Sequence, residues 1–214
     1  MYDTDEEQIE ALKKWWHQYG NTLIVAIIVF IAGYFGINYY QHSVQSTKEQ
    51  ASDVYQKLVD MNIENQTLSA EQKGEAEKLI DQLKTDYDKS TYAVFAAMYG
   101  AKFDVDAQDL DAALTELQWA LEHNKDDALG KTLRLRIARI QLAQGKTDEA
   151  LKTIAVDAGA QVANFEELRG DIYLAMGKVD DARTAFQLAY NDAKEKQLNR
   201  PVLEMKLNDL AVTE

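Results

Sequence analysis

The chain has 214 residues, a formal net charge of −13 and no cysteine. This acidic balance argues against nucleic acid as a partner, because a negative surface repels phosphates, and the absence of cysteine excludes disulfides and thiolate chemistry. One proline and ten glycines are few for a chain rich in helix-forming residues, which predicts an all-α fold.

The first predicted element is a transmembrane helix at residues 22–40. No Asp, Glu, Lys or Arg occurs between Trp15 and Thr47. A helix over the apolar centre of this stretch spans roughly 28 Å, which matches the thickness of the hydrocarbon layer of a membrane. Trp and Tyr residues flank both ends, as in interfacial aromatic belts. A buried core helix would show a polar face, and this segment has none.

A cleaved signal peptide is the alternative interpretation of this segment. The acidic leading region, the length of the apolar stretch and the bulky residues at 38–42 all argue against cleavage. Two lysines precede the span (Lys13 and Lys14) and one follows it (Lys48). The positive-inside rule therefore favours a cytoplasmic N-terminus, by a narrow margin.

The predicted span carries a small-xxx-small pair, Ala32 and Gly36, with Gly33 beside it. Such a face permits a second transmembrane helix to approach closely. Small residues are also common in spans that make no such contact. We therefore hold a helix–helix contact at these three residues and an ordinary lipid-facing surface as equal alternatives.

Several helices are expected beyond the span. Residues 46–62 and 71–87 predict two of them, and residues 91–104 predict a third. Residues 113–121 then repeat, in a weaker form, the second-helix spacing of two clearer units further along the chain. A final short helix is expected from Pro201, because proline suits a first helical turn.

The two clearer units are 32 residues apart. Gly145 and Gly177 each end a first helix, and a lysine follows each glycine. Asp148 and Asp180 come shortly afterwards, where they are expected to cap the second helices. Each unit is therefore a helix, a turn and a second helix.

Small residues are predicted where the paired helices meet. Ala150 and Ala182 permit close approach, and Ile154 and Phe186 are expected to fill the groove between the helices. Such units cannot each bury their apolar faces alone, so we expect them to stack into a short, curved solenoid that the last helix covers.

Two motif-like stretches are discounted. Residues 144–147 look like the end of a phosphate-binding loop, but Ile140 stands where that loop needs glycine. Residues 104–111 hint at a calcium loop, but Asp109 and Thr115 replace its glycine and glutamate.

No catalytic constellation is predicted either. No pair among the histidines has metal-ligand spacing, and no nucleophile stands beside a base. We expect no enzyme activity, no cofactor and no metal. The histidines are His17, His42 and His123.

The segment from Gly170 to Ala189 reads Gly-x-x-Tyr-x-x-x-Gly-x-x-x-x-Ala-x-x-x-Phe-x-x-Ala and resembles the tetratricopeptide repeat. The preceding copy departs from that pattern at Gln141 and Asp157, and the closing proline is absent. The expected fold is therefore all-α, with a single N-terminal transmembrane helix followed by a divergent tetratricopeptide-like α-solenoid of helical hairpins.

The order of an acidic tail, one span and a divergent repeat domain resembles the YfgM family, the ancillary subunit of the bacterial Sec translocon. The resemblance covers essentially the whole chain and is carried best by residues 133–145, 168–177 and 205–210. It implies a single-pass protein of the bacterial inner membrane, with residues 1–21 in the cytoplasm and residues 41–214 in the periplasm.

The family resemblance further implies a non-catalytic, membrane-tethered adaptor. Family members associate with Sec translocon subunits and with a membrane-anchored periplasmic chaperone of the prolyl-isomerase class, and they help pass unfolded secretory proteins to periplasmic chaperones. By analogy with tetratricopeptide grooves, the first helix of each pair supplies the binding surface. That analogy nominates Arg139, Leu142, Asn164, Glu167 and Asp171, with ordinary surface or packing roles as the alternative.

Two other functions stay open on the sequence. The same repeat domain would also suit a scaffold for another cell-envelope complex, such as one for division or wall synthesis. The acidic tail would also suit a cytosolic contact with an envelope-stress response regulator, for which residues 2–10 are the test segment.

Overall fold

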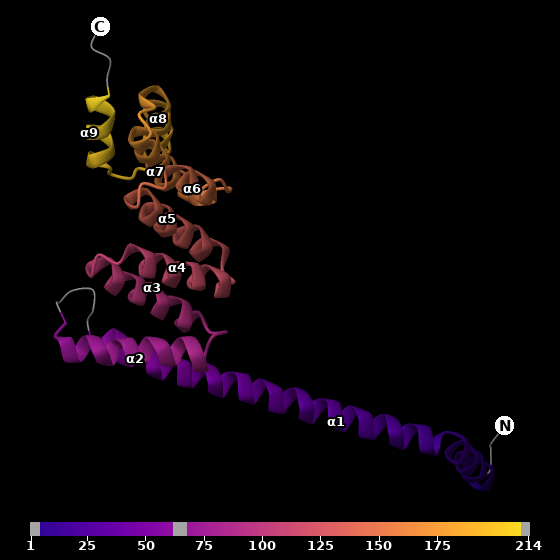
Figure 1. Cartoon of the computed structure of the whole chain (residues 1–214). Coiled ribbons are helices and arrows are strands. Elements are labelled where there is room, and N and C mark those ends of the chain that lie inside the picture. The colour runs from indigo at the N-terminus through magenta and orange to yellow at the C-terminus, as the bar shows by residue number, and fades with distance from the viewer. Residues whose placement is uncertain (1–4, 62–67, 211–214) are drawn as a thin grey trace. The chain divides into compact units, whose positions relative to one another are not determined.

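The structure is a computed structural model that describes residues 5–61 and 68–210. Within these residues the chain forms nine α-helices, one short 3-10 helix and no strand, which confirms the all-α fold. The chain divides into two compact units, Met1–Gln50 and Ala51–Glu214. The elements (Figure 1) are α1 (Asp5–Asp60), α2 (Ala70–Asp86), α3 (Thr91–Asp106), α4 (Leu110–His123), α5 (Asp127–Ala143), α6 (Thr147–Thr153), η1 (Gly159–Gln161), α7 (Val162–Ala175), α8 (Val179–Glu195) and α9 (Pro201–Asp209).

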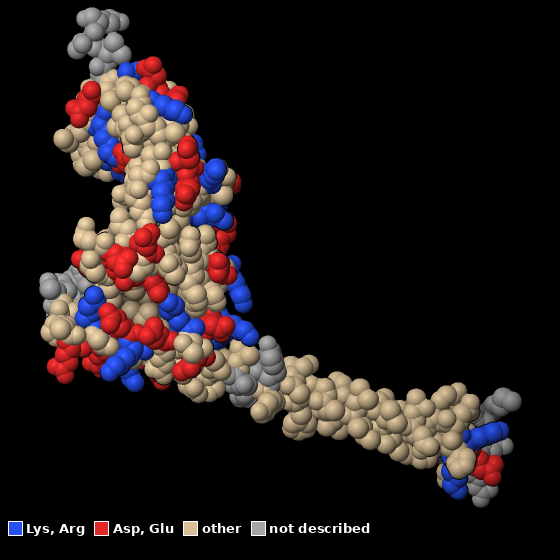
Figure 2. Space-filling model, viewed as in Figure 1, with Lys and Arg blue, Asp and Glu red and all other residues tan. Residues whose placement is uncertain are grey.

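The first unit is the N-terminal part of α1. Its apolar side chains are exposed all round the helix, and Phe30 has 74% of its surface exposed. Beyond the charged residues at its N-terminal end, the face in view in Figure 2 shows a long part of this helix without Lys, Arg, Asp or Glu. Among the described residues α1 is the one helix long and apolar enough to cross a membrane, and it contains the predicted span at 22–40.

The predicted helix at 46–62 is not a separate element. The structure continues α1 through this region to Asp60, and Asn62 lies outside the described residues. The physical reason is the absence of any helix breaker, since neither glycine nor proline occurs between Gly36 and Gly74. The sequence therefore predicted two helices where the chain forms one.

The second unit buries its apolar side chains in a series of shared clusters. Residues 51–60 of α1 pack with α2 and α3, and the next cluster joins α3, α4 and α5. A third cluster joins α5, α6 and α7, and a fourth joins α8 and α9. Because α3 and α5 each contribute buried residues to two clusters, stacking buries what no hairpin could bury alone. This arrangement confirms the tetratricopeptide-like α-solenoid.

A repeated turn sets the register of the hairpins. The residue that follows the C-cap of α3, α5, α7 and α8 has a positive φ in every case, with values of 63°, 75°, 74° and 55°. The next backbone N–H donates to the carbonyl five residues back at 2.8 to 2.9 Å, which completes a Schellman-type cap. Gly145 and Gly177 occupy this position as predicted. Gln108 and Gln197 occupy it where the sequence has no glycine.

The predicted aspartate caps are wrong. The N-cap residues of α6 and α8 are Lys146 and Lys178, and neither makes a side-chain cap hydrogen bond. The reason is the turn itself, because the residue directly after the left-handed glycine becomes the N-cap. Asp148 and Asp180 fall two residues later, in the first helical turn, where their charge still favours the positive end of the helix.

The small residues predicted at the helix pairs are confirmed. Ala150, Ala182, Ile154 and Phe186 are fully buried. The ring of Phe186 occupies the place that a Cβ atom on Gly170 would take, so α7 and α8 approach as closely as a bare backbone allows.

Candidate protein-interaction surface

Equivalent positions on the first helices of three hairpins form a row. Counted back from the left-handed turns, Lys102 on α3, Arg139 on α5 and Asp171 on α7 stand at the same repeat position. On the opposite side of α5, Gln141 accepts a hydrogen bond from Thr153 of α6 at 2.7 Å. The row therefore lies on the side of the first helices that points away from the second helices. We call it the first-helix face.

The part of this face on α3 is aromatic. The ring of Tyr55, from α1, lies 5.2 Å from Tyr92, 6.0 Å from Phe95 and 6.4 Å from Tyr99, measured between ring centroids. All four side chains are partly exposed. Partly exposed aromatic rings offer apolar contact area to a bound chain. The sequence-based predictions do not include this cluster, although the spacing of the three α3 rings places them on one helix face.

The part of the face on α5 is basic. Arg136 and Arg139 are exposed, and within the described residues no carboxylate pairs with either guanidinium. Unpaired arginines are notable in a chain with 13 net negative charges. Leu142, nominated with Arg139, is instead partly buried and packs against the cluster that contains Leu135 and Phe165.

The part of the face on α7 is already occupied by the chain itself. Arg200 donates to Asn164 and, at 3.2 Å, to Glu167. Lys206 donates to Glu167 at 3.2 Å and to the two carboxylate oxygens of Asp171 at 2.7 and 2.9 Å. The structure thus brings three of the five nominated residues together and fills the space before them with the C-terminal segment. We call Asn164, Glu167 and Asp171 the α7 acidic face.

Few interactions hold α9 on this face. Leu203 is its one fully buried side chain, and Lys206 lies 5.4 Å from the ring centroid of Phe186. Val202 and Met205 remain 60% and 64% exposed. Burying a leucine contributes about 1.5–3 kcal/mol, and partly exposed ion pairs contribute about 0–1 kcal/mol each. The contact of α9 with α7 and α8 is therefore one of the weaker contacts of the array.

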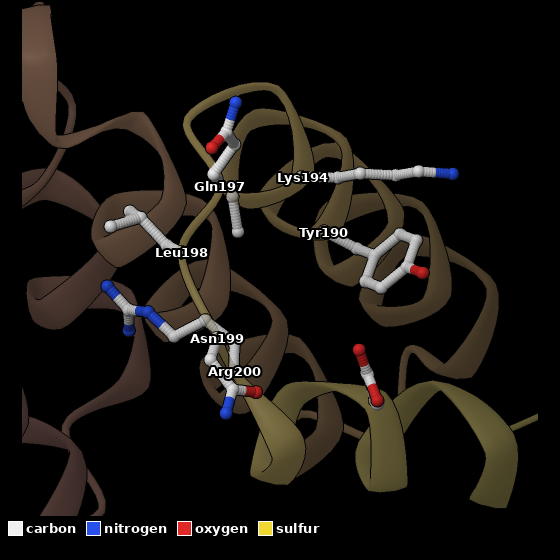
Figure 3. Close-up of a pocket in the computed structure, with 8 residues that line it drawn as sticks. Tyr190, Lys194, Gln197, Leu198, Asn199 and Arg200 are labelled. Carbon is white, nitrogen blue, oxygen red and sulfur yellow. The ribbon is translucent and has the colours of Figure 1, made fainter.

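A shallow cavity of about 240 Å³ lies between the C-terminal end of α8 and the start of α9 (Figure 3). Tyr190 and Lys194 of α8 line one side of it, and the linker from Gln197 to Arg200 lines the other. Glu204 of α9 completes the lining. The cavity separates α8 from the N-terminal turn of α9, so this end of α9 is loosely packed.

The discounted motifs lie in ordinary turns. Residues 144–147 join α5 to α6, and Asp109 is the N-cap of α4, where it accepts the N–H of Ala112 at 2.9 Å. Within the described residues no group of three His, Cys, Asp or Glu side chains could hold a metal ion. The side chain of His42 lies outside those residues.

One carboxyl group of the repeat domain has a perturbed affinity for protons. Burial raises the pKa of Asp104, and the neighbouring charges of Glu116 and Asp109 raise it further. Glu116 is itself engaged by Lys84 at 2.6 Å, which links α4 to α2. Asp104 therefore lies near the junction between the α1–α2 and α3–α4 hairpins.

The N-terminal glycines have room around them. A Cβ atom added at Gly33 or Gly36 would meet no other atom within 4 Å, and Ala32 is exposed. The helix face on which the sequence placed a possible transmembrane contact is therefore open in the isolated chain.

Comparison with known proteins places these features in a family. The tetratricopeptide repeat-like domain matches residues 13–212. Three curated relatives bear the name "Ancillary SecYEG translocon subunit". The protein from Haemophilus influenzae is 35% identical over 98% of this chain and 99% of its own length. The protein from Aggregatibacter actinomycetemcomitans is 30% identical over 96% of this chain and 97% of its own length. The protein from Escherichia coli is 29% identical over 99% of this chain and 99% of its own length. No solved structure gives a significant match.

Proposed function

This chain belongs to the family of ancillary SecYEG translocon subunits, and we propose that it is a non-catalytic, membrane-tethered adaptor at the Sec translocon. In this role it helps to pass secreted proteins to periplasmic chaperones. The relatives' names support the association with the translocon, and the repeat domain supplies a helical surface that suits protein binding. The transfer to chaperones is the finer part of the proposal.

The proposed topology follows from α1. Residues 22–40 cross the bacterial inner membrane, residues 1–21 stay in the cytoplasm and residues 41–214 lie in the periplasm. The exposed apolar surface of α1 supports the span, since an uncovered surface of this kind is unstable in water. The two lysines before the span support a cytoplasmic N-terminus.

Anchoring makes weak contacts sufficient. A domain tethered to the membrane meets other membrane-bound partners at a high effective concentration, so modest affinity gives substantial occupancy. The partners proposed are Sec translocon subunits, a membrane-anchored prolyl-isomerase-like chaperone and unfolded secretory chains.

The observation that carries the proposed binding role is the open first-helix face on α3 and α5. Tyr99 and Phe95 offer ring surface, and Arg136 and Arg139 offer unpaired charge nearby along the stack. Both helices pack against α4 and share one buried cluster, so the aromatic and basic parts lie on the first helices of successive hairpins. A bound chain could contact both.

Photo-crosslinking in native membranes tests the proposal. A photoreactive residue at Arg139 or Phe95 is expected to capture Sec translocon subunits, the prolyl-isomerase-like chaperone or a translocating secretory protein. The same residue at the exposed Glu149, on the second-helix side, is the control and is expected to capture none of them. Capture of components of another cell-envelope complex from Arg139, with no translocon subunit, would replace this proposal with the scaffold alternative.

A further inference from the structure

The α7 acidic face already shows the chemistry of the ligand that it accepts. Its occupant presents an arginine at the N-cap of a helix, a leucine three residues later and a lysine three residues after that: Arg200, Leu203 and Lys206. The two cations meet the side-chain oxygens of the face, and the leucine enters the buried cluster with Phe186. The charges of this occupant and the position of its buried leucine therefore match the α7 acidic face over one short helix.

We propose that the α7 acidic face is a binding site for a basic amphipathic helix of a partner protein, and that α9 occupies this site until the partner displaces it. The proposal goes beyond the proposed function, because it assigns a second surface and does not depend on what the α3 and α5 parts of the first-helix face bind. It commits the partner to a stated chemistry: an apolar residue between two basic residues at the start of a helix.

Charge complementarity argues for this ligand. The chain carries 13 net negative charges, and Glu167 and Asp171 stand together on one helix face. Each of these two carboxylates receives a cation from the C-terminal segment rather than from a neighbouring repeat. An acidic or neutral helix placed there would leave two partly buried carboxylates without counter-charges, which is costly.

The way α9 is held argues that it can be displaced. One of its nine residues is fully buried, and the ion-paired side chains of Arg200 and Lys206 are 32% and 26% exposed. Val202 and Met205 are exposed to solvent, and Leu207 is only partly buried against the cluster that contains Phe186. A competing helix binds only while α9 is away from the face, so its apparent affinity falls as the bound fraction of α9 rises. Loosening α9 must therefore strengthen binding of the competitor.

A peptide competition experiment tests this directly. The probe is a fluorescent peptide with the sequence of residues 198–210, titrated into the full chain in detergent. Wild-type protein is expected to bind it weakly. The variant Arg200→Ala/Lys206→Ala, in which α9 is loosened, is expected to bind it at least roughly tenfold more tightly.

Neutralising the face locates the binding. In the loosened background, Glu167→Gln with Asp171→Asn is expected to abolish peptide binding. The matched control, Asp148→Asn with Glu149→Gln, removes two exposed charges on α6 and is expected to leave it unchanged. Equal binding by the neutralised and control proteins, or no gain on loosening α9, would overturn the proposal.

A reversible cross-link between α8 and α9 gives a second test that does not depend on whether the loosened variant folds. The chain has no cysteine, so Lys194→Cys and Glu204→Cys can be joined by a reducible cross-linker across the cavity between α8 and α9. The locked protein retains Arg200 and Lys206 and is expected to bind no peptide until it is reduced. Peptide binding that is equal before and after reduction contradicts the proposal. A loosened variant that dimerises by exchanging α9 also contradicts it, because the occupant would then be a second copy of this chain.

Discussion

Gly170 of α7 lies directly against the ring of Phe186 of α8, with no space for a side chain between them. This contact fixes the distance between α7 and α8, the two helices against which α9 lies. We expect Gly170→Ala to destabilise the repeat domain by about 1–3 kcal/mol, since the added methyl group must push the ring out of its buried position. Urea unfolding followed by circular dichroism measures the loss.

Gly74 in α2 provides the control for this substitution. A Cβ atom there meets nothing within 4 Å, and the residue is inside a helix. Gly74→Ala is expected to stabilise the domain by about 0.5–1 kcal/mol through helix propensity. Equal effects of the two substitutions would show that the close approach at Gly170 is not a constraint.

Gln108 is expected to be a site of stored backbone strain. Its φ of 63° is one that glycine adopts freely and side-chain-bearing residues adopt at a cost. Gln108→Gly is expected to raise the free energy of unfolding by about 0.5–1 kcal/mol, and Gly145→Ala is expected to lower it by about 1 kcal/mol. Thermal unfolding of both variants measures these changes.

A substitution at the neighbouring Ala107 is the control that distinguishes relief of backbone strain at Gln108 from a general effect of introducing glycine. Ala107 has a right-handed conformation at the C-cap of α3, so Ala107→Gly gains no relief of strain and is expected to destabilise slightly. Stabilisation by glycine at both positions would contradict the strain at Gln108.

Asp104 is expected to make stability depend on pH. Its pKa is raised in the folded state above the ordinary value of 3.8, so the ionised form is disfavoured there. Its contribution to stability is therefore greatest at acid pH and is lost as pH rises through the raised pKa. Asp104→Asn is expected to be more stable than wild type at pH 7, with the difference shrinking toward pH 3.8.

Denaturant titrations at a series of pH values check this expectation. Asp81→Asn, at an exposed position on α2, is the control for the loss of one carboxylate. A larger advantage of Asp104→Asn at acid pH than at pH 7 would reverse the sign and contradict the assignment.

The arginines on α5 are expected to contribute to partner binding. Reversing both charges, in Arg136→Glu/Arg139→Glu, is expected to weaken association with the partner that contacts this face by about 1–3 kcal/mol, or roughly five- to 150-fold. The control variant Lys146→Glu/Lys152→Glu changes the net charge by the same amount away from this face. Lys146 lies in the α5–α6 turn and Lys152 lies on α6. A loss of binding that is equal in the two proteins would indicate a general effect of net charge.

The sequence predicted the repeat units where glycine marks their turns. Gly145 and Gly177 identified two units, and the buried positions of Ala150 and Phe186 followed from their spacing. The upstream unit was harder to recognise because Gln108 takes the left-handed conformation without glycine's signature. That conformation comes from the packing of the hairpin and not from local preference.

The binding surface was only partly predictable. The repeat register correctly placed Arg139 on an exposed part of the first-helix face, and it placed Asn164, Glu167 and Asp171 together on another part. It could not show that Arg200 folds back onto them, because a contact between residues more than thirty positions apart leaves no local pattern. The approach of Tyr55 to the α3 rings was missed for the same reason, whereas the shared face of the three α3 rings was readable from their spacing.

Purification of the tagged full-length chain from native membranes in mild detergent tests the central claim most directly. Sec translocon subunits are expected to be recovered with the chain in amounts well above those found with an unrelated single-span protein. Repeated absence of those subunits from a preparation that retains the intact chain would contradict an adaptor at the translocon.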